Sequence, residues 1–382
     1  MPPTQQPDTL SPFVKPFTMM AKAAGARCNL ACRYCYYLDK EQLYPGQACQ
    51  MSEPLLRQFI SEYIATQQTQ DVWFIWHGGE PLLRRLDFYR QAVLLQREYA
   101  GSHIIHNALQ TNGTLLDDDW CRFLADEGWL VGISIDGTAE WHDAYRRQRG
   151  GQPTHALVMQ GIERLKRHGV DWNAMAVVNR INADHPREFY QFFKDIGCQY
   201  LQFTPIVEPA MPELSVTPEQ WGTFCCELYD AWAEANDIGR IFVQLFDATL
   251  ANWVGIEPGV CTLAETCGCS PVMEWNGDVY CCDHFVSDAY RLGNVHQQSL
   301  LSLVSSPQQV SFGLSKRTSL PRQCRECQWL PVCHGECPKN RFVATTDGEP
   351  GLNYLCKGYR QFFAHVAADM EQLAAEITQN NL

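Results

Sequence analysis

The sequence predicts an α/β fold in which six strand-and-helix units precede a smaller, cysteine-rich C-terminal part. Two observations support this prediction: short apolar runs alternate with longer amphipathic segments through the first half, and ten of the 18 cysteines lie beyond residue 260. With 382 residues, of which 46% are hydrophobic, the chain can bury one large domain and a smaller one. The regular alternation favours parallel strands joined by right-handed crossovers.

Runs rich in apolar, β-branched and aromatic residues predict six strands, at 17–23, 72–76, 103–110, 130–135, 172–178 and 200–207. Amphipathic segments between them predict helices at 52–66, 86–99, 117–127, 155–168 and 185–196. Ser52 followed by Pro54 is typical of a helix start, and so is Asp117. Such units form either a βα barrel, closed or partial, or a doubly wound sheet, because both folds align their loops in a similar way.

The most unusual sequences follow the carboxyl ends of the predicted strands. The loop CNLACRYC, which begins at Cys28, follows the first strand, and HGGEP, which begins at His77, follows the second. QTNG from Gln110 follows the third strand, and SIDG from Ser134 lies at the end of the fourth. Because βα folds carry their chemistry in these loops, the sequence predicts the functional site at this edge.

The charge and the N-terminal sequence narrow the class of protein and its location. A formal net charge of −13 at pH 7 argues against nucleic acid or an anionic membrane as the partner. The N-terminal segment lacks the basic start and apolar core of a signal peptide, and no apolar run is long enough to cross a bilayer. We therefore predict a cytoplasmic protein, and we expect about its first 15 residues to be flexible.

Eighteen cysteines are unusual in a cytoplasmic chain, because reducing conditions disfavour disulfides. The scattered ones are best explained as small apolar core residues, an interpretation that applies to Cys121, Cys198, Cys225 and Cys226. The clustered ones are better explained as metal ligands. The loop from Cys28 holds three cysteines at spacings of four and three, and three thiolates leave one metal position open for a substrate or cofactor.

This loop resembles the cysteine motif of the radical S-adenosylmethionine superfamily. The resemblance implies that Cys28, Cys32 and Cys35 hold a 4Fe-4S cluster whose unique iron chelates the methionine amine and carboxylate of the cofactor. It also implies that Tyr37 lies beside the adenosyl group. S-adenosyl-L-methionine is therefore the expected cofactor.

The loops after the second and fourth strands fit the same resemblance. The glycines of GGEP allow the backbone to approach a ligand closely, and Glu80 can accept a hydrogen bond from the methionine ammonium. Without the cysteine loop, this motif is equally typical of a surface turn. The resemblance assigns Gly78, Gly79 and Glu80 to cofactor binding, and Ser134 and Arg146 to the methionine carboxylate.

The remaining clustered cysteines lie in the C-terminal third. Spacing alone leaves a zinc ribbon open for the run C-x2-C-x5-C-x3-C that begins at Cys324. Asn276 and Gly277 predict a hairpin turn that brings Cys282 back beside Cys267. This part of the chain resembles the SPASM extension, which binds two auxiliary 4Fe-4S clusters.

By position, the SPASM resemblance implies two sets of ligands, so that three 4Fe-4S clusters are expected in all. The ligands of the first auxiliary cluster are Cys261, Cys267, Cys282 and Cys337. The ligands of the second are Cys324, Cys327, Cys333 and Cys356. Cys269 and Cys281 are close enough in sequence to replace a neighbouring ligand.

Several longer stretches are together similar to the anaerobic sulfatase-maturating enzymes: AKAAGARCNLACRYCYY, LQTNGTLLDDDW, LVGISIDG, YLQFTPIVE, NGDVYCCDHFV and CHGECPKNRF. The similarity implies a partial (β/α)6 TIM-type barrel over residues 1–240, and a SPASM domain with a C-terminal helix over 241–382. Those enzymes oxidise a Cys or Ser residue of a sulfatase chain to Cα-formylglycine, usually within a C/S-x-P/A-x-R segment. The expected partners are an unfolded or nascent sulfatase polypeptide and a reducing protein such as flavodoxin or ferredoxin.

The family chemistry also implies the catalytic residues. The 5′-deoxyadenosyl radical takes a hydrogen atom from Cβ, after which a base removes a proton and the auxiliary clusters receive a second electron. Asp283 matches the catalytic aspartate of the family, although an aspartate at the end of a hairpin elsewhere would simply be solvated. Tyr37 and His77 complete the predicted catalytic set.

His77 departs from the family pattern, which has glutamine before GGEP. Histidine can donate a hydrogen bond as glutamine does, but it can also take up a proton near neutral pH. HGGEP occurs among radical enzymes that crosslink ribosomally made peptides, so a maturase that crosslinks or otherwise modifies such a peptide is the alternative function. A third class, an electron carrier or structural zinc protein, would need neither GGEP nor SIDG beside an open cysteine loop.

Overall fold

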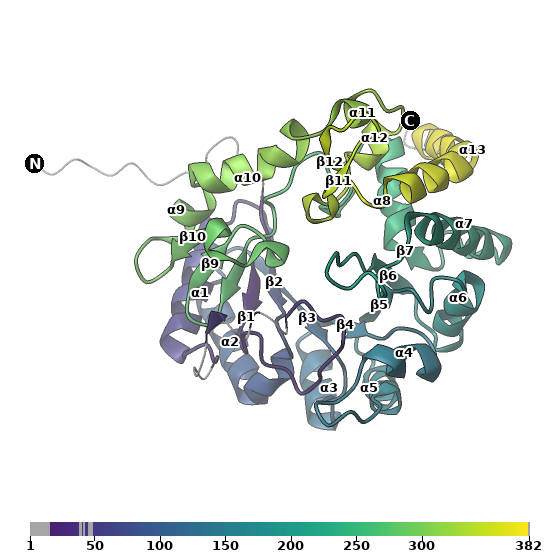
Figure 1. Ribbon diagram of the computed structural model, residues 1–382. Coiled ribbons are helices and arrows are strands. Elements are labelled where there is room, and N and C mark those ends of the chain that lie inside the picture. The colour runs from purple at the N-terminus through teal and green to yellow at the C-terminus, as the bar shows by residue number, and fades with distance from the viewer. Residues whose placement is uncertain (1–15, 38–39, 41–42, 45–48, 381–382) are drawn as a thin grey trace, which may run out of the picture.

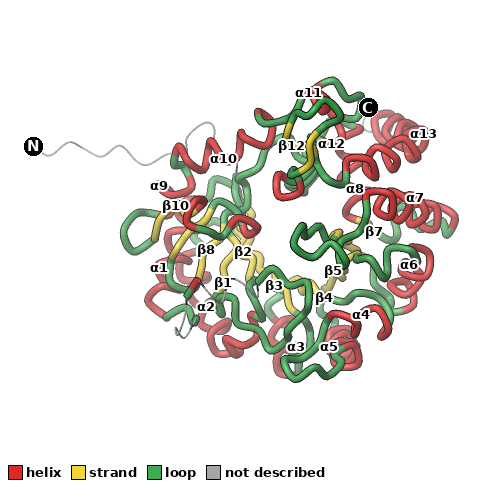
Figure 2. Tube along the Cα trace, viewed as in Figure 1, coloured by secondary structure: helices red, strands yellow, loops and turns green. Residues whose placement is uncertain are grey.

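The computed structural model describes residues 16–380 apart from 38–39, 41–42 and 45–48. The flexibility predicted for the N-terminal segment concerns residues 1–15, which lie outside the described residues. The chain forms an open ring in which the strands line the inner side and the helices cover the outer side (Figure 1). The same division between inner strands and outer helices is visible in Figure 2.

One sheet of ten strands runs through the molecule in the order β10-β9-β8-β1-β2-β3-β4-β5-β6-β7. All neighbours from β1 to β7 are parallel, which confirms the predicted βα units. Their strands are β1 (Met20–Lys22), β2 (Asp71–Trp76), β3 (Ile104–Thr111), β4 (Leu130–Ser134), β5 (Trp172–Val178), β6 (Tyr200–Pro205) and the short β7 (Phe242–Val243).

This strand order decides between the two arrangements that the sequence left open. The strands follow one another in chain order, whereas a doubly wound sheet reverses its order partway across. Within the described residues, β7 and β10 are the two free edges of the sheet, so the barrel is partial. The predicted fold class is therefore confirmed.

The predicted helices agree with the structure to within one residue at each end. Ser52 caps the first one by accepting a hydrogen bond from the backbone N–H of Leu55, and Asp117 caps the third by accepting one from Trp120. The helices of the barrel are α1 (Glu53–Thr66), α2 (Arg85–Tyr99), α3 (Asp118–Asp126), α4 (Ala139–Tyr145), α5 (His155–His168), α6 (Pro186–Asp195), α7 (Pro218–Glu234) and α8 (Gln244–Trp253).

The predicted hairpin is formed by β8 (Val272–Glu274) and β9 (Asp278–Tyr280), which pair antiparallel, and β10 (Arg291–Asn294) adds a third strand. Unexpectedly, β8 also pairs in parallel with β1, with Lys22 opposite Glu274. The C-terminal part thus continues the barrel sheet at one edge, while β7 continues it at the other. The division at residues 240 and 241 stays a prediction, and it falls just before β7.

The rest of the C-terminal part consists of short elements and one long helix. The short ones are α9 (Leu300–Val304), α10 (Pro307–Thr318), α11 (Arg322–Arg325), α12 (Leu330–Cys333), β11 (Val343–Ala344) and β12 (Pro350–Leu352). The long helix α13 (Cys356–Asn380) lies beside α7, as Figure 1 shows. Gly358 permits this contact, since a Cβ there would lie 2.3 Å from the carbonyl oxygen of Pro218.

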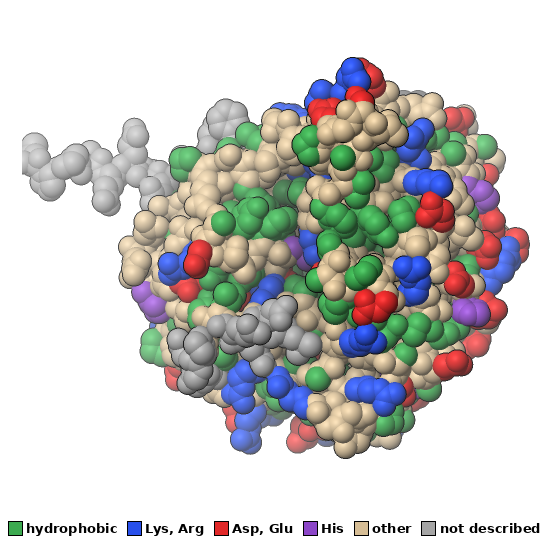
Figure 3. All heavy atoms as spheres, in the orientation of Figure 1, with side chains coloured by type: hydrophobic (Ala, Val, Ile, Leu, Met, Phe, Trp, Pro, Cys, Tyr) green, Lys and Arg blue, Asp and Glu red, His purple; other side chains and the backbone are tan. Residues whose placement is uncertain are grey.

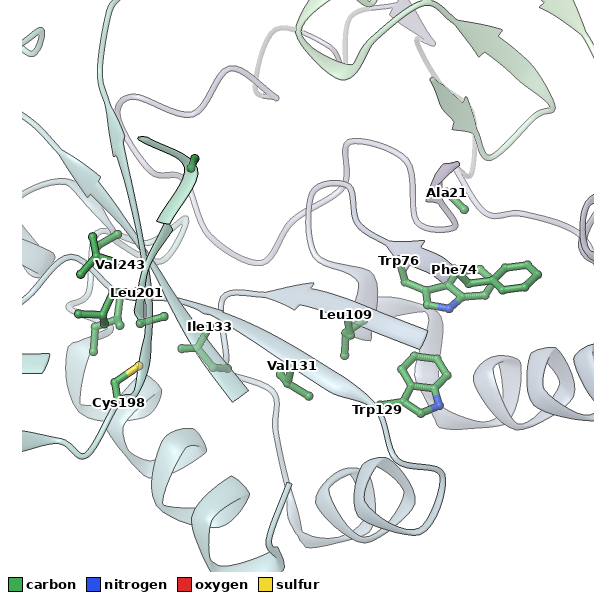
Figure 4. Packing of buried hydrophobic residues seen from close by; sticks show 14 of the residues in the cluster. Ala21, Phe74, Trp76, Leu109, Trp129, Val131, Ile133, Cys198, Leu201 and Val243 are labelled. Atoms are coloured by element: carbon green, nitrogen blue, oxygen red, sulfur yellow. The ribbon is translucent and has the colours of Figure 1, made fainter. Parts of the chain in front are cut away.

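The hydrophobic core fills the space between the sheet and the outer helices. Figure 4 shows Trp76 and Trp129 reaching into this layer, where their rings lie 6.4 Å apart and nearly parallel. The cysteines interpreted as core residues are all buried: Cys121, Cys198, Cys225 and Cys226. None of the helices in the described residues has the length and apolar character that crossing a membrane requires.

Candidate active site

The three cysteines of the first loop lie together above the carboxyl ends of the strands. The segment after α4 holds this loop in place, because Ala31 donates a backbone hydrogen bond to the carbonyl of Arg147 at 2.8 Å. Burial raises the pKa of Cys28 to about 12 and that of Cys32 to about 11, and the thiol of Cys35 adds to both shifts. Such thiols remain neutral until a metal displaces their protons, which suits a metal cluster better than an exposed redox pair.

The GGEP segment passes directly under the cysteine loop. Gly79 and Glu80 donate backbone hydrogen bonds to the carbonyls of Gly25 and Arg27, at 2.9 and 2.8 Å. A Cβ on Gly79 would lie only 2.2 Å from the Arg27 carbonyl oxygen. This glycine therefore permits close contact with the cysteine loop itself, whereas the sequence had suggested close contact with a ligand.

Glu80 is fully buried at the centre of the site. One carboxylate oxygen accepts hydrogen bonds from Leu82 N–H at 3.0 Å and Thr111 Oγ1 at 2.7 Å, and the other accepts one from Asn112 N–H at 2.9 Å. Burial raises the pKa of Glu80 to about 7, and these hydrogen bonds partly oppose the shift. The second oxygen can accept a further bond, so this carboxyl group fits the ammonium of S-adenosylmethionine.

The structure brings Ser134 and Arg146 to the same edge but gives both of them partners from the chain. Ser134 Oγ accepts a hydrogen bond from Gln110 Nε2 at 3.0 Å. Arg146 forms a two-bond ion pair with Asp136, at 2.9 and 3.1 Å. A cofactor carboxylate would therefore share this guanidinium with Asp136, a residue that the sequence analysis did not single out.

Asp283 lies buried between the barrel and the C-terminal part. One of its carboxylate oxygens accepts hydrogen bonds from the hydroxyls of Tyr36 and Tyr37, at 2.5 and 2.6 Å. The other oxygen lies 2.5 Å from Lys22 Nζ and 3.6 Å from Lys40 Nζ. Burial alone would raise the pKa of Asp283, but the two ammonium groups outweigh burial and hold the pKa well below its usual value.

His77 is connected to Asp283 through the hydroxyl of Tyr37. Its Nδ1 accepts a hydrogen bond from the backbone N–H of Gly78 at 2.7 Å and lies 3.1 Å from the Tyr37 hydroxyl. Burial lowers the pKa of His77 to about 4, so the ring is neutral at pH 7 with its proton on Nε2. His77 and Gln110 line a cavity of about 1050 Å³ in the barrel. On the face drawn in Figure 3, hydrophobic side chains surround a central hollow.

The cysteines predicted to hold the first auxiliary cluster come together from distant parts of the sequence. The neighbouring thiols of Cys261 and Cys267 add to burial in raising the pKa of Cys282 to about 12. Cys337 is also close to Cys261 and Cys282, whose thiols further raise its pKa. Of the two alternative ligands, Cys269 is close to Cys261 and Cys267. Cys281, in contrast, is fully buried directly after β9.

The second set of cysteines gathers around one cavity of the C-terminal part. Cys324, Cys327, Cys333 and Cys356 all line one cavity of about 480 Å³. No group of three or more His, Cys, Asp or Glu side chains in the described residues is arranged to hold a single metal ion. The four cysteines around this cavity are those that the SPASM resemblance predicts as ligands of the second auxiliary cluster.

The sequence analysis missed Lys22, Lys40 and Tyr36, which bind Asp283 together with Tyr37. One signal was available for Lys22: it stands in a predicted buried strand, where an ionisable residue is rare unless a partner compensates it. Nothing in the local sequence indicated Lys40, because its contact with Asp283 joins residues that are 243 positions apart.

A buried histidine beneath the site makes protein stability depend on pH. His142 accepts a hydrogen bond from Asp136 N–H at 3.2 Å through Nδ1, and its Nε2 lies 3.0 Å from Thr154 Oγ1. Burial lowers the pKa of His142 to about 4. Since the unfolded chain binds this proton below about pH 6.5, the stability contributed by the neutral ring is present above that pH and is lost as the pH falls toward 4.

We predict that His142→Gln lowers the free energy of unfolding at pH 7 but reduces its loss on acidification. The wild-type ring should account for about 2 kcal/mol of the loss between pH 7 and pH 5, and glutamine does not titrate. Anaerobic urea unfolding of both proteins at the two pH values measures the difference. If wild type and His142→Gln lose equal amounts of unfolding free energy between pH 7 and pH 5, the lowered pKa assigned to His142 is contradicted.

Comparison with known proteins agrees with the fold and the cysteine sites. Residues 24–193 match the model of the radical SAM superfamily, and residues 267–328 match that of an iron-sulfur cluster-binding domain, SPASM. The chain is 53% identical to the serine-type anaerobic sulfatase-maturating enzyme of Bacteroides thetaiotaomicron over 97% of this chain and 94% of that protein. It is 30% identical to the cysteine-type enzyme of Clostridium perfringens over 95% of this chain and 99% of that protein.

A solved structure, native anSMEcpe with bound AdoMet and Cp18Cys peptide, superposes with a TM-score of 0.86 at 30% identity. The match covers 95% of this chain and 100% of that one. The fold and the two cysteine-rich regions thus define a radical SAM enzyme with a SPASM domain, and they imply S-adenosylmethionine and 4Fe-4S clusters, auxiliary ones included, as its cofactors. Within that class, the chain belongs to the anaerobic sulfatase-maturating enzymes.

Proposed function

We propose that the protein oxidises a serine or cysteine residue of a sulfatase polypeptide to Cα-formylglycine. The observation that carries the proposal is the position of Asp283: it directly follows Cys282, a predicted ligand of the first auxiliary cluster, and two tyrosines of the first-cluster loop bind its carboxylate. A base at this point lies between the loop predicted to hold the first cluster and the C-terminal part predicted to hold the auxiliary clusters, and the reaction needs both. The family membership and the peptide bound in the similar structure support the same function.

Each group of residues has a role in this proposal. The ligands of the first cluster are Cys28, Cys32 and Cys35, and the auxiliary ligands are the two sets of four cysteines described above. Glu80, Ser134 and Arg146 would hold the methionine end of the cofactor, and Tyr37 would contact its adenosyl group. When bound, the cofactor and the first cluster supply the radical that removes a hydrogen atom from Cβ, and the auxiliary clusters supply an acceptor for the second electron.

The residues of the chain then provide the proton transfer. Asp283 takes the proton that the substrate O–H or S–H loses as the C=O or C=S bond forms, and Tyr36 and Tyr37 keep its carboxylate oriented. In the cysteine reaction, water then replaces the sulfur, which leaves as hydrogen sulfide. The low pKa of Asp283 keeps the group ionised before the reaction begins. A reducing partner such as flavodoxin or ferredoxin would supply the first electron, and the need for reduced clusters and free thiols fits a cytoplasmic location.

The function is tested with anaerobically reconstituted protein and a sulfatase-derived peptide, made in a serine and a cysteine version. We propose serine as the natural target, because identity to the serine-type enzyme is 53% and to the cysteine-type enzyme 30%. Formation of an aldehyde, detected by mass spectrometry after reaction with a carbonyl probe, is the expected result. A peptide that loses two hydrogens but has no carbonyl would favour the crosslinking alternative, whose product has the same mass as oxidised serine.

We predict that His77→Gln retains most of the peptide oxidation. The ring of His77 is neutral and acts by hydrogen bonding, and glutamine can make bonds of the same kind. Loss of one orienting hydrogen bond costs on the order of 1 kcal/mol, which is a several-fold effect on rate. Turnover of the same peptide by wild type and variant measures it, and a loss of about a hundredfold would instead make His77 an acid or base.

A further inference from the structure

The side chain of Lys22 lies fully buried at the end of β1 and contacts two carboxylates of the C-terminal part. Its ammonium lies 2.5 Å from Asp283 and 3.1 Å from Glu274. Glu274 is the register partner of Lys22 across the parallel β1–β8 pair. Burial opposes the charge of Lys22, but the two carboxylates outweigh burial and raise its pKa, so the group is a cation.

Asp283 does not lie on any of the strands that the structure describes. It lies beyond the end of β9, in the short 3-10 turn Asp283–Phe285, so no strand holds its backbone. Its carboxylate contacts come from the barrel and the first-cluster loop: Lys22, Tyr36, Tyr37 and Lys40. Among these four residues, Lys22 is the one that lies on a strand. Tyr36 and Tyr37 lie in a turn of the segment that follows it, and Lys40 has a 3-10 conformation in the same segment.

A group on a strand fixes a partner more precisely than a group on a loop does. Lys22 is also held from its other side, because Glu274 constrains the same ammonium. The carboxylate of Asp283 therefore takes its position relative to the barrel, where the cofactor loops lie, from Lys22. We propose that Lys22 is a positioning residue for peptide oxidation, an inference that rests on the proposed role of Asp283 as the base.

The test is the ratio of formylglycine formed to 5′-deoxyadenosine released. Lys22→Met removes the ammonium and keeps an unbranched side chain of similar length. Cofactor cleavage depends on the first-cluster loop and should continue, whereas oxidation should fall, so the ratio is expected to drop by about tenfold or more. Lys22→Arg keeps the charge but moves it farther from β1, and its ratio is expected to fall several-fold. If the site needs only a positive charge at residue 22, and not its exact position, Lys22→Arg will keep the wild-type ratio.

Lys194→Met is the matched control. Lys194 and Tyr190 lie on α6 and contact Asp237, which follows α7, at 2.5 and 2.8 Å, so they reproduce the lysine–aspartate–tyrosine arrangement away from the site. This variant should keep the wild-type ratio. Glu274→Gln removes the charge of the other carboxylate but keeps an oxygen that can accept the hydrogen bond from Lys22, so its ratio is expected to fall much less than that of Lys22→Met.

Four outcomes would overturn the inference. One is a wild-type ratio in a Lys22→Met protein with wild-type iron content. If Lys22→Met does not fold, a wild-type ratio in Lys22→Arg overturns the inference instead. Another is a fall of the ratio in Glu274→Gln as large as that in Lys22→Met, because this would mean that Lys22 acts by linking β1 to β8. If the wild-type protein itself forms no formylglycine from any sulfatase peptide, the proposed function has failed, and the inference fails with it.

Discussion

Replacing Asp283 with asparagine is expected to reduce peptide oxidation by about a hundredfold or more while cofactor cleavage continues. Asparagine keeps the shape of the side chain and can still accept the hydrogen bonds from Tyr36 and Tyr37. It cannot take up a proton at neutral pH. Lys22 keeps Glu274 as a partner at 3.1 Å, and Lys40, which loses the Asp283 carboxylate, can still donate to the backbone carbonyl of residue 283.

The experiment compares formylglycine and 5′-deoxyadenosine from the same anaerobic reactions, with iron content as the measure of intact clusters. Asp237→Asn serves as the control, because Asp237 is a buried aspartate with a lysine and a tyrosine as partners, away from the site. Formylglycine formation at nearly the wild-type rate by Asp283→Asn would remove Asp283 from the role of base. Asp283→Glu keeps the carboxyl group but moves it by one methylene, so only partial activity is expected.

The barrel could be predicted from the sequence because its signals are local. The alternation of apolar runs with amphipathic segments marked the strands and helices of the βα units, and Ser52 and Asp117 marked two helix starts correctly. Asn276 and Gly277 likewise marked the turn between β8 and β9. In each of these cases the residues that determine the structure are neighbours in the sequence.

Contacts between distant segments could not be predicted in the same way. The parallel pairing of β1 with β8 joins residues about 250 positions apart, and no pattern within either strand indicates it. The grouping of Lys22, Glu274 and Asp283 follows directly from that pairing. The ion pair between Arg146 and Asp136 was missed for a different reason. Asp136 is part of the recognised SIDG motif and Arg146 was assigned to the cofactor, but only the fold shows that the two side chains face each other.

The site itself was predicted largely from cysteine spacing and from a family resemblance. The structure brings the three cysteines of the first loop together, and it brings Cys282 close to Cys261 and Cys267 as the hairpin predicted. The register of the first auxiliary set was less certain from spacing, and Cys269 does lie near two of its members. Their ligand roles remain predictions that iron analysis of variants can test.

Replacing Cys28, Cys32 and Cys35 together with alanine is expected to remove one cluster and all cofactor cleavage. Three ligands in the first loop and four in each auxiliary set correspond to three 4Fe-4S clusters, so about one third of the iron should be lost. Without the first cluster, no open iron remains to bind the methionine end of the cofactor. The auxiliary sets lie on other segments, and their iron should therefore persist.

The matched control replaces three buried core cysteines, Cys121, Cys198 and Cys226, with alanine. Each of these changes removes only a small apolar side chain, so the control should keep its full iron content and its cleavage activity, at some cost in stability. The measurements are iron and acid-labile sulfide per chain and 5′-deoxyadenosine per hour under reducing conditions. The assignment of the first loop as a cluster site would be contradicted if the variant without Cys28, Cys32 and Cys35 cleaved the cofactor at the wild-type rate. It would also be contradicted if reconstituted wild type held stoichiometric zinc and no iron. Loss of all the iron would mean instead that the auxiliary clusters depend on the first loop, which their separate ligand sets argue against.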